Sequence, residues 1–402
     1  MSNRIIYNTQ GLFISPYSGE FSAIDDFCIG GHKTLKRIEK IQQFDYSIAQ
    51  TNISLREFGV NRSVFFDAIE SPEIDFNFSY IPDGITNENR MNFNVNHFSG
   101  LRNEKMFSGL LSNSENFNKR DFYLAIRKDE NDYNFSGSTF TNDFIRPTST
   151  GFITDPNSTG YSILHFQNCY LREYSFNISV GALPQVSQTY VADNLNYYIS
   201  GSGLAYIKID PKSGQMITEN EKIIFPKYFK YNQTNISGQN LLSHNKLGVT
   251  ISSSSNTGVL FYSEDLQSLN YSITFNRLKL TSLNYRLPLY RPIKFPVEGS
   301  INLGLLVNKD LSGSFFDQLN KNLSYNLTLN FKENMRGVYP TQLIFSGCKF
   351  NKISYTSSIE NERKADLNFN FNLDQENNNC AIFSSGNLLY GMVGSTKKVL
   401  IF

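Results

Sequence analysis

The sequence predicts an all-β protein with minor α-helix, built as two tandem β-sandwich or barrel-like domains, each with a short flanking helix. Two observations lead to this prediction: apolar and polar residues alternate along many segments, and parts of the first half recur in the second half. Apolar side chains at every second position indicate a strand with one buried and one polar face. Recurrence of such strands in the same order indicates a duplicated structural unit.

Three matches in the same order define the duplication. Tyr46-Ser47-Ile48 recurs as Tyr271-Ser272-Ile273, and Phe122–Arg127 is similar to Tyr325–Asn330. The matched residues contain no shared catalytic group, so the repeat indicates architecture and not chemistry. A third set keeps one offset of 179 residues: Leu164, Phe166, Cys169, Ser175 and Ser179 match Leu343, Phe345, Cys348, Ser354 and Ser358.

Individual strands follow from the alternation. A strand is predicted after Pro72, another after Pro296, and the clearest one over Ala365–Leu373. Ser314–Leu323 carries apolar residues four apart and is predicted to be a short helix with Ser314 as its cap, and Leu101–Leu111 is its less regular counterpart.

The spacing of the repeat sets the domain prediction. Residues 1–200 form the first domain, residues 201–261 a connecting segment that contributes strands, and residues 262–402 the second domain. The first copy is longer, with insertions at about 87–118 and 128–160. Loops of this length are uncommon unless they bind something, so we expect contacts with neighbouring molecules to order them.

Composition narrows the functional class. The chain has 402 residues, only 18% of them charged, and a net charge of +1, which gives no general affinity for nucleic acid or membranes. No apolar run is long enough to span a bilayer, and Met1–Gln10 lacks a secretory apolar core. The four cysteines have no metal-ligand spacing, so Cys169 and Cys348 are predicted to be buried thiols in a protein made in a reducing cytosol.

No catalytic, metal or cofactor site is predicted. The histidines are far apart in the sequence, and His165, near Cys169, corresponds to Ile344 in the second copy. Asp129, Glu130 and Asp132 could form a cation site or an acid–base pair, but a solvated turn is favoured. The basic run from Lys33 to Lys40 is interpreted as a solvated face or subunit contact and not as a phosphate site. We therefore expect a protein that is not an enzyme.

The chain resembles the tail tube (major tail) proteins of long-tailed bacteriophages, in the version with two tandem tube domains. The residues that carry this resemblance are Tyr46-Ser47-Ile48 with Leu55–Gly59 and the strand from Pro72, their echo at Tyr271-Ser272-Ile273, Leu280–Asn284 and Pro296, the closing strand pairs Tyr174–Val180 with Val186–Leu195 and Ile353–Ile359 with Ala365–Leu373, and the opening segment Tyr7–Phe13.

The resemblance implies a structural virion protein. Two-domain chains of this family would form homotrimeric rings of six quasi-equivalent units, which stack into a hollow tube that conducts DNA during ejection. The expected partners are other copies of the chain, other tail proteins and passing double-stranded DNA that is not bound specifically. The expected location is the virion tail, after synthesis in the host cytoplasm, with no membrane contact.

A tube places two requirements on the sequence. Its wall must not hold DNA, so a neutral or acidic polar face should line the lumen. The candidates for this lumen face are Asp75, Asn77, Ser79, Asp366, Asn368 and Asn370. Rings must also contact each other, and the candidates for a ring-stacking loop are Asn94, Phe98, Leu101 and Phe107.

Other functions remain open from the sequence. A receptor-binding or tail fibre protein would also be rich in β-structure, aromatics and asparagine. A tail terminator or baseplate hub would form a ring that stacks once. A hydrolase on a β scaffold would need two carboxylates facing each other across a cleft, for which the sequence gives no sign.

Overall fold

The structure is a computed structural model, and it describes residues 10–15, 28–29, 32–50, 52–56, 63–68, 71–82, 86–91, 93, 106–111, 119–127, 161–199, 204–209, 216–224, 247–253, 259–263, 266–283, 285, 287–307, 323–331, 341–356, 364–373 and 382–385. Most of these residues lie in antiparallel strands, which confirms the all-β class. The expected insertion at 128–160 lies outside the described residues.

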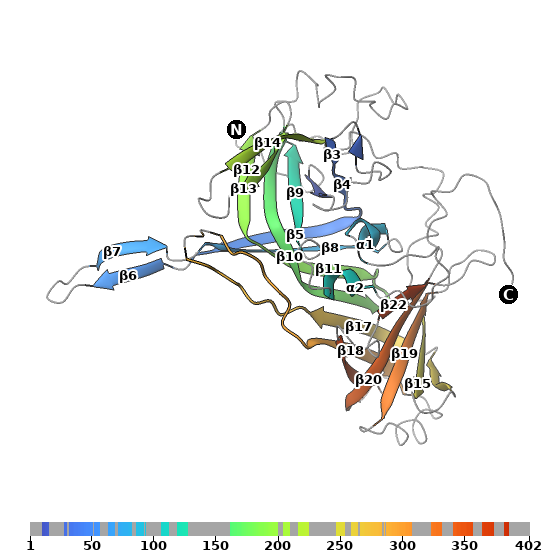
Figure 1. The fold of residues 1–402 in the computed structure, drawn as a ribbon. Helices are drawn as coiled ribbons and strands as arrows, with labels where there is room; N and C mark the ends of the chain where they lie inside the picture. The colour runs from blue at the N-terminus through green and yellow to red at the C-terminus, as the bar shows by residue number, and fades with distance from the viewer. Residues whose placement is uncertain are drawn as a thin grey trace, which may run out of the picture.

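Two sets of strands follow the same plan (Figure 1). The first unit consists of β1 (Gln10–Ile14), β4 (Lys36–Arg37), β5 (Ile41–Ala49), β8 (Glu73–Tyr80), β9 (Arg120–Arg127), β10 (Tyr161–Ser179), β11 (Gln185–Ala192) and β12 (Asn194–Ile199). The second unit consists of β15 (Leu247–Ser253), β16 (Val259–Ser263), β17 (Leu266–Thr274), β18 (Val297–Leu306), β19 (Ser324–Phe331), β20 (Thr341–Thr356), β21 (Lys364–Leu373) and β22 (Ile382–Ser385).

The remaining elements are short additions to these units. They are β2 (Cys28–Ile29), β3 (His32–Thr34), β6 (Asn52–Arg56), β7 (Ser63–Ala68), α1 (Thr86–Arg90), α2 (Ser108–Leu111), β13 (Leu204–Ile209) and β14 (Met216–Ile224). β13, β14 and β15 fall in the segment expected to connect the two copies.

One sheet runs through both units. The first unit contributes the order β5-β8-β11-β10, and the second contributes β17-β18-β21-β20, with β10 paired to β17. We call these eight strands the main sheet. In each unit a second layer continues from the long strand: β10 pairs with β9 and β12, and β9 with β1, while β20 pairs with β19 and β22, and β19 with β15. Each strand of one unit therefore has a counterpart in the other.

The strand registers repeat as well as the order. Tyr46 lies opposite Phe76 in the first unit, and the residues 225 positions later, Tyr271 and Ile301, lie opposite each other in the second. The closing pair keeps the offset of 179, because Tyr174 lies opposite Gln188 and Ile353 opposite Leu367. The two units are therefore equivalent residue by residue over most of the main sheet.

One expected match needs a correction of two residues. The sequence aligned Phe122 with Tyr325, but the pairing of β9 and β19 with the long strands aligns Phe122 with Leu327. In both alignments the same side chains face the core, because strand side chains alternate with period two. Sequence alternation therefore could not separate the two registers.

The long strands β10 and β20 bend at equivalent residues. Asn168 in β10 and Gly347 in β20 have positive φ values of 49° and 73°. In each bend the backbone amide donates to a side chain of the paired strand: Asn168 N to Asp121 Oδ1 at 2.8 Å, and Gly347 N to Asn326 Oδ1 at 3.4 Å. The bend lets one strand belong to both layers of its unit, as the curved course of β10 shows (Figure 1).

An aromatic core fills the space between the two layers. In the first unit the Phe76 ring lies 4.7 Å from Phe166 and 5.3 Å from Phe122, measured between centroids. In the second unit Phe345 lies 5.3 Å from Phe371. Aromatic pairs at these distances contribute about 1 kcal/mol each beyond their buried area. Cys169 and Cys348 are buried free thiols in these cores, as the sequence predicted.

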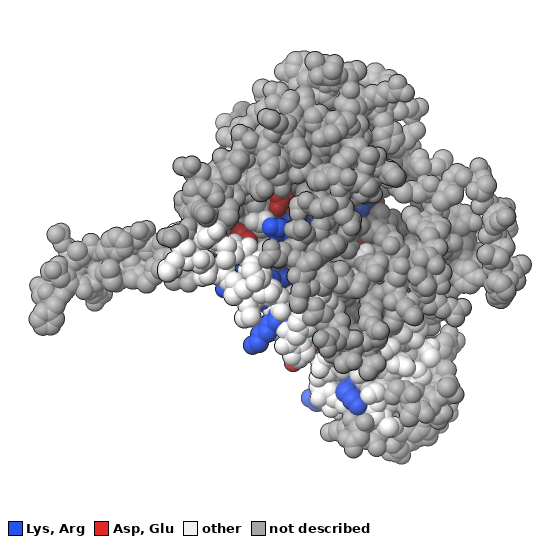
Figure 2. All heavy atoms as spheres, viewed as in Figure 1, with Lys and Arg blue, Asp and Glu red and all other residues white. Residues whose placement is uncertain are grey.

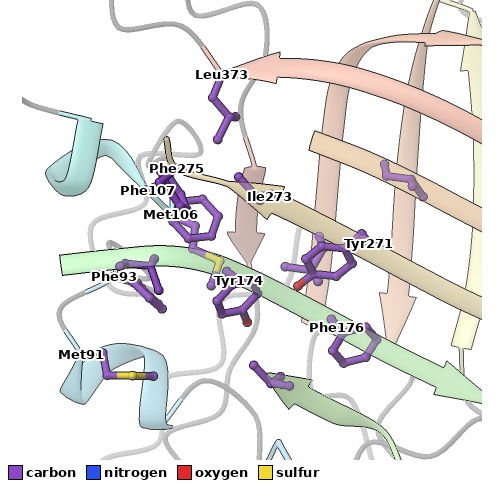
Figure 3. Packing of buried hydrophobic residues seen from close by; sticks show 14 of the residues in the cluster. Met91, Phe93, Met106, Phe107, Tyr174, Phe176, Tyr271, Ile273, Phe275 and Leu373 are labelled. Atoms are coloured by element: carbon purple, nitrogen blue, oxygen red, sulfur yellow. The ribbon is translucent and has the colours of Figure 1, made fainter. Parts of the chain in front are cut away.

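The first unit carries two helices in the segment expected to be a long loop. α1 and α2 bring Met91, Phe93, Met106 and Phe107 into the core where the two units meet, with Phe107 packed on Phe275 (Figure 3). α2 lies within the predicted helical segment 101–111. The helix predicted at 314–323 lies outside the described residues, apart from Leu323.

The bends give a matched test of the repeat. Replacing Gly347 with alanine forces a Cβ into the left-handed region, so we expect a loss of about 1 kcal/mol in the free energy of unfolding. Asn168→Gly, at the equivalent bend, should be neutral or slightly stabilising, because asparagine already tolerates this region less well than glycine. Urea unfolding curves of both variants check this. A Gly347→Ala variant as stable as the wild type would contradict the bend geometry.

Candidate self-assembly interface

The feature that joins the two units is the pairing of β10 with β17. The last strand of the first unit's part of the main sheet lies antiparallel to the first strand of the second unit's part. Phe176 lies opposite Tyr271, and Tyr174 opposite Ile273. We call this pairing the internal junction.

Apolar side chains seal the core side of the internal junction. The Phe176 and Tyr271 rings stack with centroids 5.4 Å apart, and they are 2% and 1% exposed. Ile273 is also fully buried (Figure 3). Burying side chains of this size contributes about 2 kcal/mol each, so the junction holds the two units firmly together.

The main sheet ends at two strands that are equivalent to those of the internal junction. Among the described strands, β5 pairs only with β8, and residues 350–356 of β20 pair only with β21. β5 corresponds to β17, and this part of β20 corresponds to β10. We call these two edges the terminal edges. They are the counterparts of the two strands that pair with each other at the internal junction, but no described strand pairs with them.

Large apolar side chains are exposed at the terminal edges. Tyr46 is 47% exposed and Ile48 is 55% exposed, whereas their counterparts Tyr271 and Ile273 are 1% and 0% exposed. On the other edge, Tyr355 is 44% exposed, and it corresponds to the buried Phe176. An edge strand with exposed apolar side chains is a surface for pairing with another strand.

A segment of the second unit also crosses onto the first unit. Residues 276–294, between β17 and β18, form a hairpin through the bridges of Arg277 with Ile293 and of Leu280 with Tyr290. We call this hairpin the second arm. Arg277 Nε donates to Leu171 O at 2.8 Å, and Lys279 Nζ lies 3.5 Å from Ser71 O. The second arm thus lies along β10 and the start of β8 (Figure 1).

A buried ion pair fixes the second arm. Arg291 Nε lies 2.8 Å from Asp193 Oδ1, and the two side chains are 4% and 1% exposed. Burial raises the pKa of Asp193 to about 6, even though Arg291 favours the carboxylate. Desolvation therefore outweighs the attraction in setting this pKa. Burial also lowers the pKa of Arg277 to about 10, and its guanidinium lies 5.2 Å from the centre of the Tyr170 ring.

The six candidate lumen residues lie on one face of the main sheet, opposite the core. Asn77, Asp366 and Asn370 are exposed there. Asp75 is partly covered by Arg172, 3.3 Å away, and Asn368 accepts a hydrogen bond from Asn351 at 2.8 Å. Ser79 is only 6% exposed, and Gln185 donates to its hydroxyl at 2.7 Å. Five of the six therefore reach the surface of this face, and Ser79 lies beneath Gln185.

The candidate ring-stacking residues are placed less fully. Asn94, Phe98 and Leu101 lie outside the described residues. Phe107 is 2% exposed, and its ring lies 5.5 Å from Tyr174 and 5.4 Å from Phe275. Its side chain is part of the chain's own core and does not reach a neighbouring ring in this conformation.

A buried acid was not anticipated from the sequence. Glu88 of α1 is buried, and the hydroxyl groups of Tyr80 and Tyr174 both donate to its Oε1. Burial raises the pKa of Glu88, although both tyrosine hydrogen bonds favour the carboxylate. Its hydrogen bonds to Tyr80 and Tyr174 anchor α1 in the first core. Nothing in its Asn-rich surroundings marked it in the sequence.

The sequence's candidate histidine and cysteine do not form a catalytic pair in the described residues, and Asp129, Glu130 and Asp132 lie outside them. His165 stacks on Tyr123 and lies 3.1 Å from Asp121 Oδ2, while Cys169 Sγ donates to Phe166 O. Burial raises the pKa of the Cys169 thiol well above its usual value, which disfavours a thiolate nucleophile. The part of the chain that the structure describes contains no cluster of metal-ligating side chains and no helix long and apolar enough to cross a membrane.

Comparisons with known proteins give no identification. No protein family model matches the chain, and no curated protein matches its sequence.

The ion pair at the second arm gives the next prediction. Arg291→Ala leaves the Asp193 carboxylate buried without its cation, and we expect a loss of about 3 kcal/mol at neutral pH. The loss should shrink as the pH falls from about 7 to about 4, because protonated Asp193 needs no cation. This sign follows because the folded pKa lies above the ordinary value of 3.8, so the group favours folding at low pH.

Thermal unfolding of the wild type and the variant across this pH range is the measurement. The double variant Arg291→Met with Asp193→Leu is the control, since it removes both charges and should recover much of the loss. The same destabilisation at every pH would show that the carboxylate is not the cause.

Proposed function

We propose that this protein is a structural subunit that assembles head to tail into rings, and that the rings stack into the tail tube of a long-tailed bacteriophage, a conduit for DNA. One observation carries the proposal: the two terminal edges of the main sheet are the counterparts of the two strands already paired at the internal junction. A second copy of the chain is therefore the natural strand donor for each edge.

The proposed contact between two copies of the chain repeats the strand pairing of the internal junction. Moving its register to the terminal edges places Tyr355 of one copy opposite Tyr46 of the next, and Ile353 opposite Ile48. The exposed apolar side chains of both edges then meet, as Phe176 and Tyr271 do inside the chain. Such a contact uses different surfaces on the two partners, so it closes into a ring when the rotation between units permits. The resemblance to tail tube proteins supplies the number, three chains with six units.

A ring of this kind would have a polar inner wall. The second layers cover the core face of the main sheet, so the opposite face would line the lumen. A row of asparagines crosses that face through adjacent strands: Asn177, Asn270, Asn302 and Asn368. Uncharged amides compete poorly with counterions for phosphate, so DNA would slide past them.

Charges near the proposed wall support the same conclusion. Alternation along the strands puts these residues on the wall face: Asp45, Glu73, Asp75, Glu173, Glu298 and Asp366, with Arg172, Lys349, Lys352 and Lys364. Acidic residues outnumber basic ones in this set. Figure 2 shows the Lys and Arg side chains of the described residues scattered among uncharged ones on the face in view.

Electron microscopy of the purified protein tests the proposal. Stacked rings with three-fold symmetry, forming tubes, are the expected result. Single rings that do not stack would favour a tail terminator or baseplate hub instead. A protein that stays monomeric at high concentration would count against self-assembly and favour a receptor-binding or fibre protein.

The terminal edges make the contact specific. Tyr46→Lys and Tyr355→Lys each put a charge where an apolar pair should be buried, and each should weaken the contact between copies by about 2 kcal/mol, roughly thirtyfold. Tyr197→Lys replaces a tyrosine with 56% exposure that lies on neither terminal edge, and it should assemble normally. Sedimentation velocity over a concentration series measures the shift. Equal assembly by all three variants would rule out the terminal edges as the interface.

The composition of the wall makes a separate prediction. A triple variant with Asn177→Lys, Asn270→Lys and Asn302→Lys should assemble, but its tubes should retain short DNA duplexes at low salt and release them as salt rises. The same three positions changed to glutamine are the control, and they should retain no DNA. Retained DNA should resist nuclease, because the wall would enclose it. If the nuclease digests it as fast as free DNA, this face lies outside the tube.

A further inference from the structure

The chain contains two equivalent arms. β6 and β7 form a hairpin between β5 and β8, in which Asn52 lies opposite Ala68 and Leu55 opposite Phe65. The second arm has the same register 225 residues later, with Arg277 opposite Ile293 and Leu280 opposite Tyr290. We call the β6–β7 hairpin the first arm. It has kept the length and pairing of the second arm.

The two arms differ in what they contact. The second arm lies on the first unit, where it covers Tyr170 and Asp193, which are 3% and 1% exposed. Among the described strands, β6 and β7 pair only with each other, and in Figure 1 they extend away from the main sheet. Among the described residues, the first arm therefore has the form of the second arm but lies away from the main sheet of its own chain.

The matching surface exists on the second unit. The counterparts of Tyr170 and Asp193 are Lys349 and Asn372, and both are exposed. Asn351, the counterpart of Arg172 beside the second arm's base, is exposed as well. The region that the second arm covers on the first unit is therefore open to solvent on the second.

We infer that the first arm docks on the second unit of a neighbouring copy, in the place that corresponds to the second arm on the first unit. This inference rests on the proposed function, because the neighbour is the copy whose β20 would pair with β5. Each contact between chains would then consist of a strand pair and an arm that crosses it, as the internal junction does.

The residues of the first arm and of the second unit that would form this contact differ in a matched way from those that hold the second arm on the first unit. This matched difference supports the docking. The ion pair of Arg291 with Asp193 is replaced by Phe66 with Asn372, so neither a lone buried arginine nor a lone buried aspartate would result. Arg277 is replaced by Asn52, whose amide can still donate to a backbone carbonyl, here that of Phe350 in place of Leu171. Replacing the buried ion pair by uncharged side chains suits partners that must first exist apart in water.

Cysteine cross-linking tests the docking. Phe66→Cys and Asn372→Cys are combined in a chain with Cys28→Ser and Cys380→Ser, and assembled protein is treated with a short bismaleimide. This reagent is used because an arginine and an aspartate that meet at their tips hold their backbones too far apart for a direct disulfide. Denaturing gels should show covalent dimers and trimers. Arg291→Cys with Asp193→Cys, in the same background, is the positive control within one chain, and mass spectrometry should detect its cross-link. Phe66→Cys with Asn177→Cys is the mismatched control and should stay monomeric.

The outcomes separate the arm from the proposed function. Rings with covalent oligomers support the docking. Rings without cross-linked chains, while the positive control forms its cross-link, would overturn the docking and leave the ring in place. A cross-link between residues 66 and 372 inside a single chain would also overturn it, since the arm would then lie on its own second unit. If no rings form, the proposed function fails first, and this is seen by microscopy before cross-linking.

Discussion

The pairing of β10 with β17 is the constraint on which the rest of the structure depends. It joins the two halves of the main sheet in one register, and it places the Phe176 and Tyr271 rings in a shared core. It also determines which strands lie at the edges of the main sheet. Because β10 of the first unit pairs with β17 of the second, β5 and the end of β20 are left as the edges of the main sheet. The exposed apolar residues there follow from this arrangement.

Much of the fold could be predicted because strand side chains alternate. The strands after Pro72 and Pro296 and the strand at Ala365–Leu373 form as expected, since half-buried strands have a strong period-two pattern. The same period hid the two-residue error at Phe122, because a shift of two keeps every face. The site was harder to predict. Tyr46 and Tyr271 both begin a Tyr-Ser-Ile segment, and the position of their strands in the sheet makes one exposed and the other buried.

The difference in charge between the internal junction and its counterparts has a physical reason. The buried pair of Arg291 with Asp193 forms within one chain, where the two groups are never far apart once the chain folds. At a contact between chains, each charge would be exposed before assembly and would have to lose its water on binding. Phe66 and Asn372 at the corresponding positions avoid this cost. A contact that forms reversibly is therefore better made from apolar and amide groups, which is what Phe66 and Asn372 offer at the positions of this ion pair.

The same edges must also avoid pairing with themselves, since two copies of β5 could in principle join edge to edge. The charges at the terminal edges discriminate against this. β5 carries Asp45 as its one charged residue, whereas residues 349–356 of β20 carry Lys349 and Lys352. Two β5 strands would bring acidic groups together and two β20 strands would bring basic groups together. With the register of the internal junction, β5 with β20 would place Asp45 opposite Thr356 and Lys352 opposite Ala49, so no like charges meet. Like-charge repulsion along short edges thus favours the head-to-tail order, which is the order that the internal junction already has and the only one of the three that can be repeated around a ring.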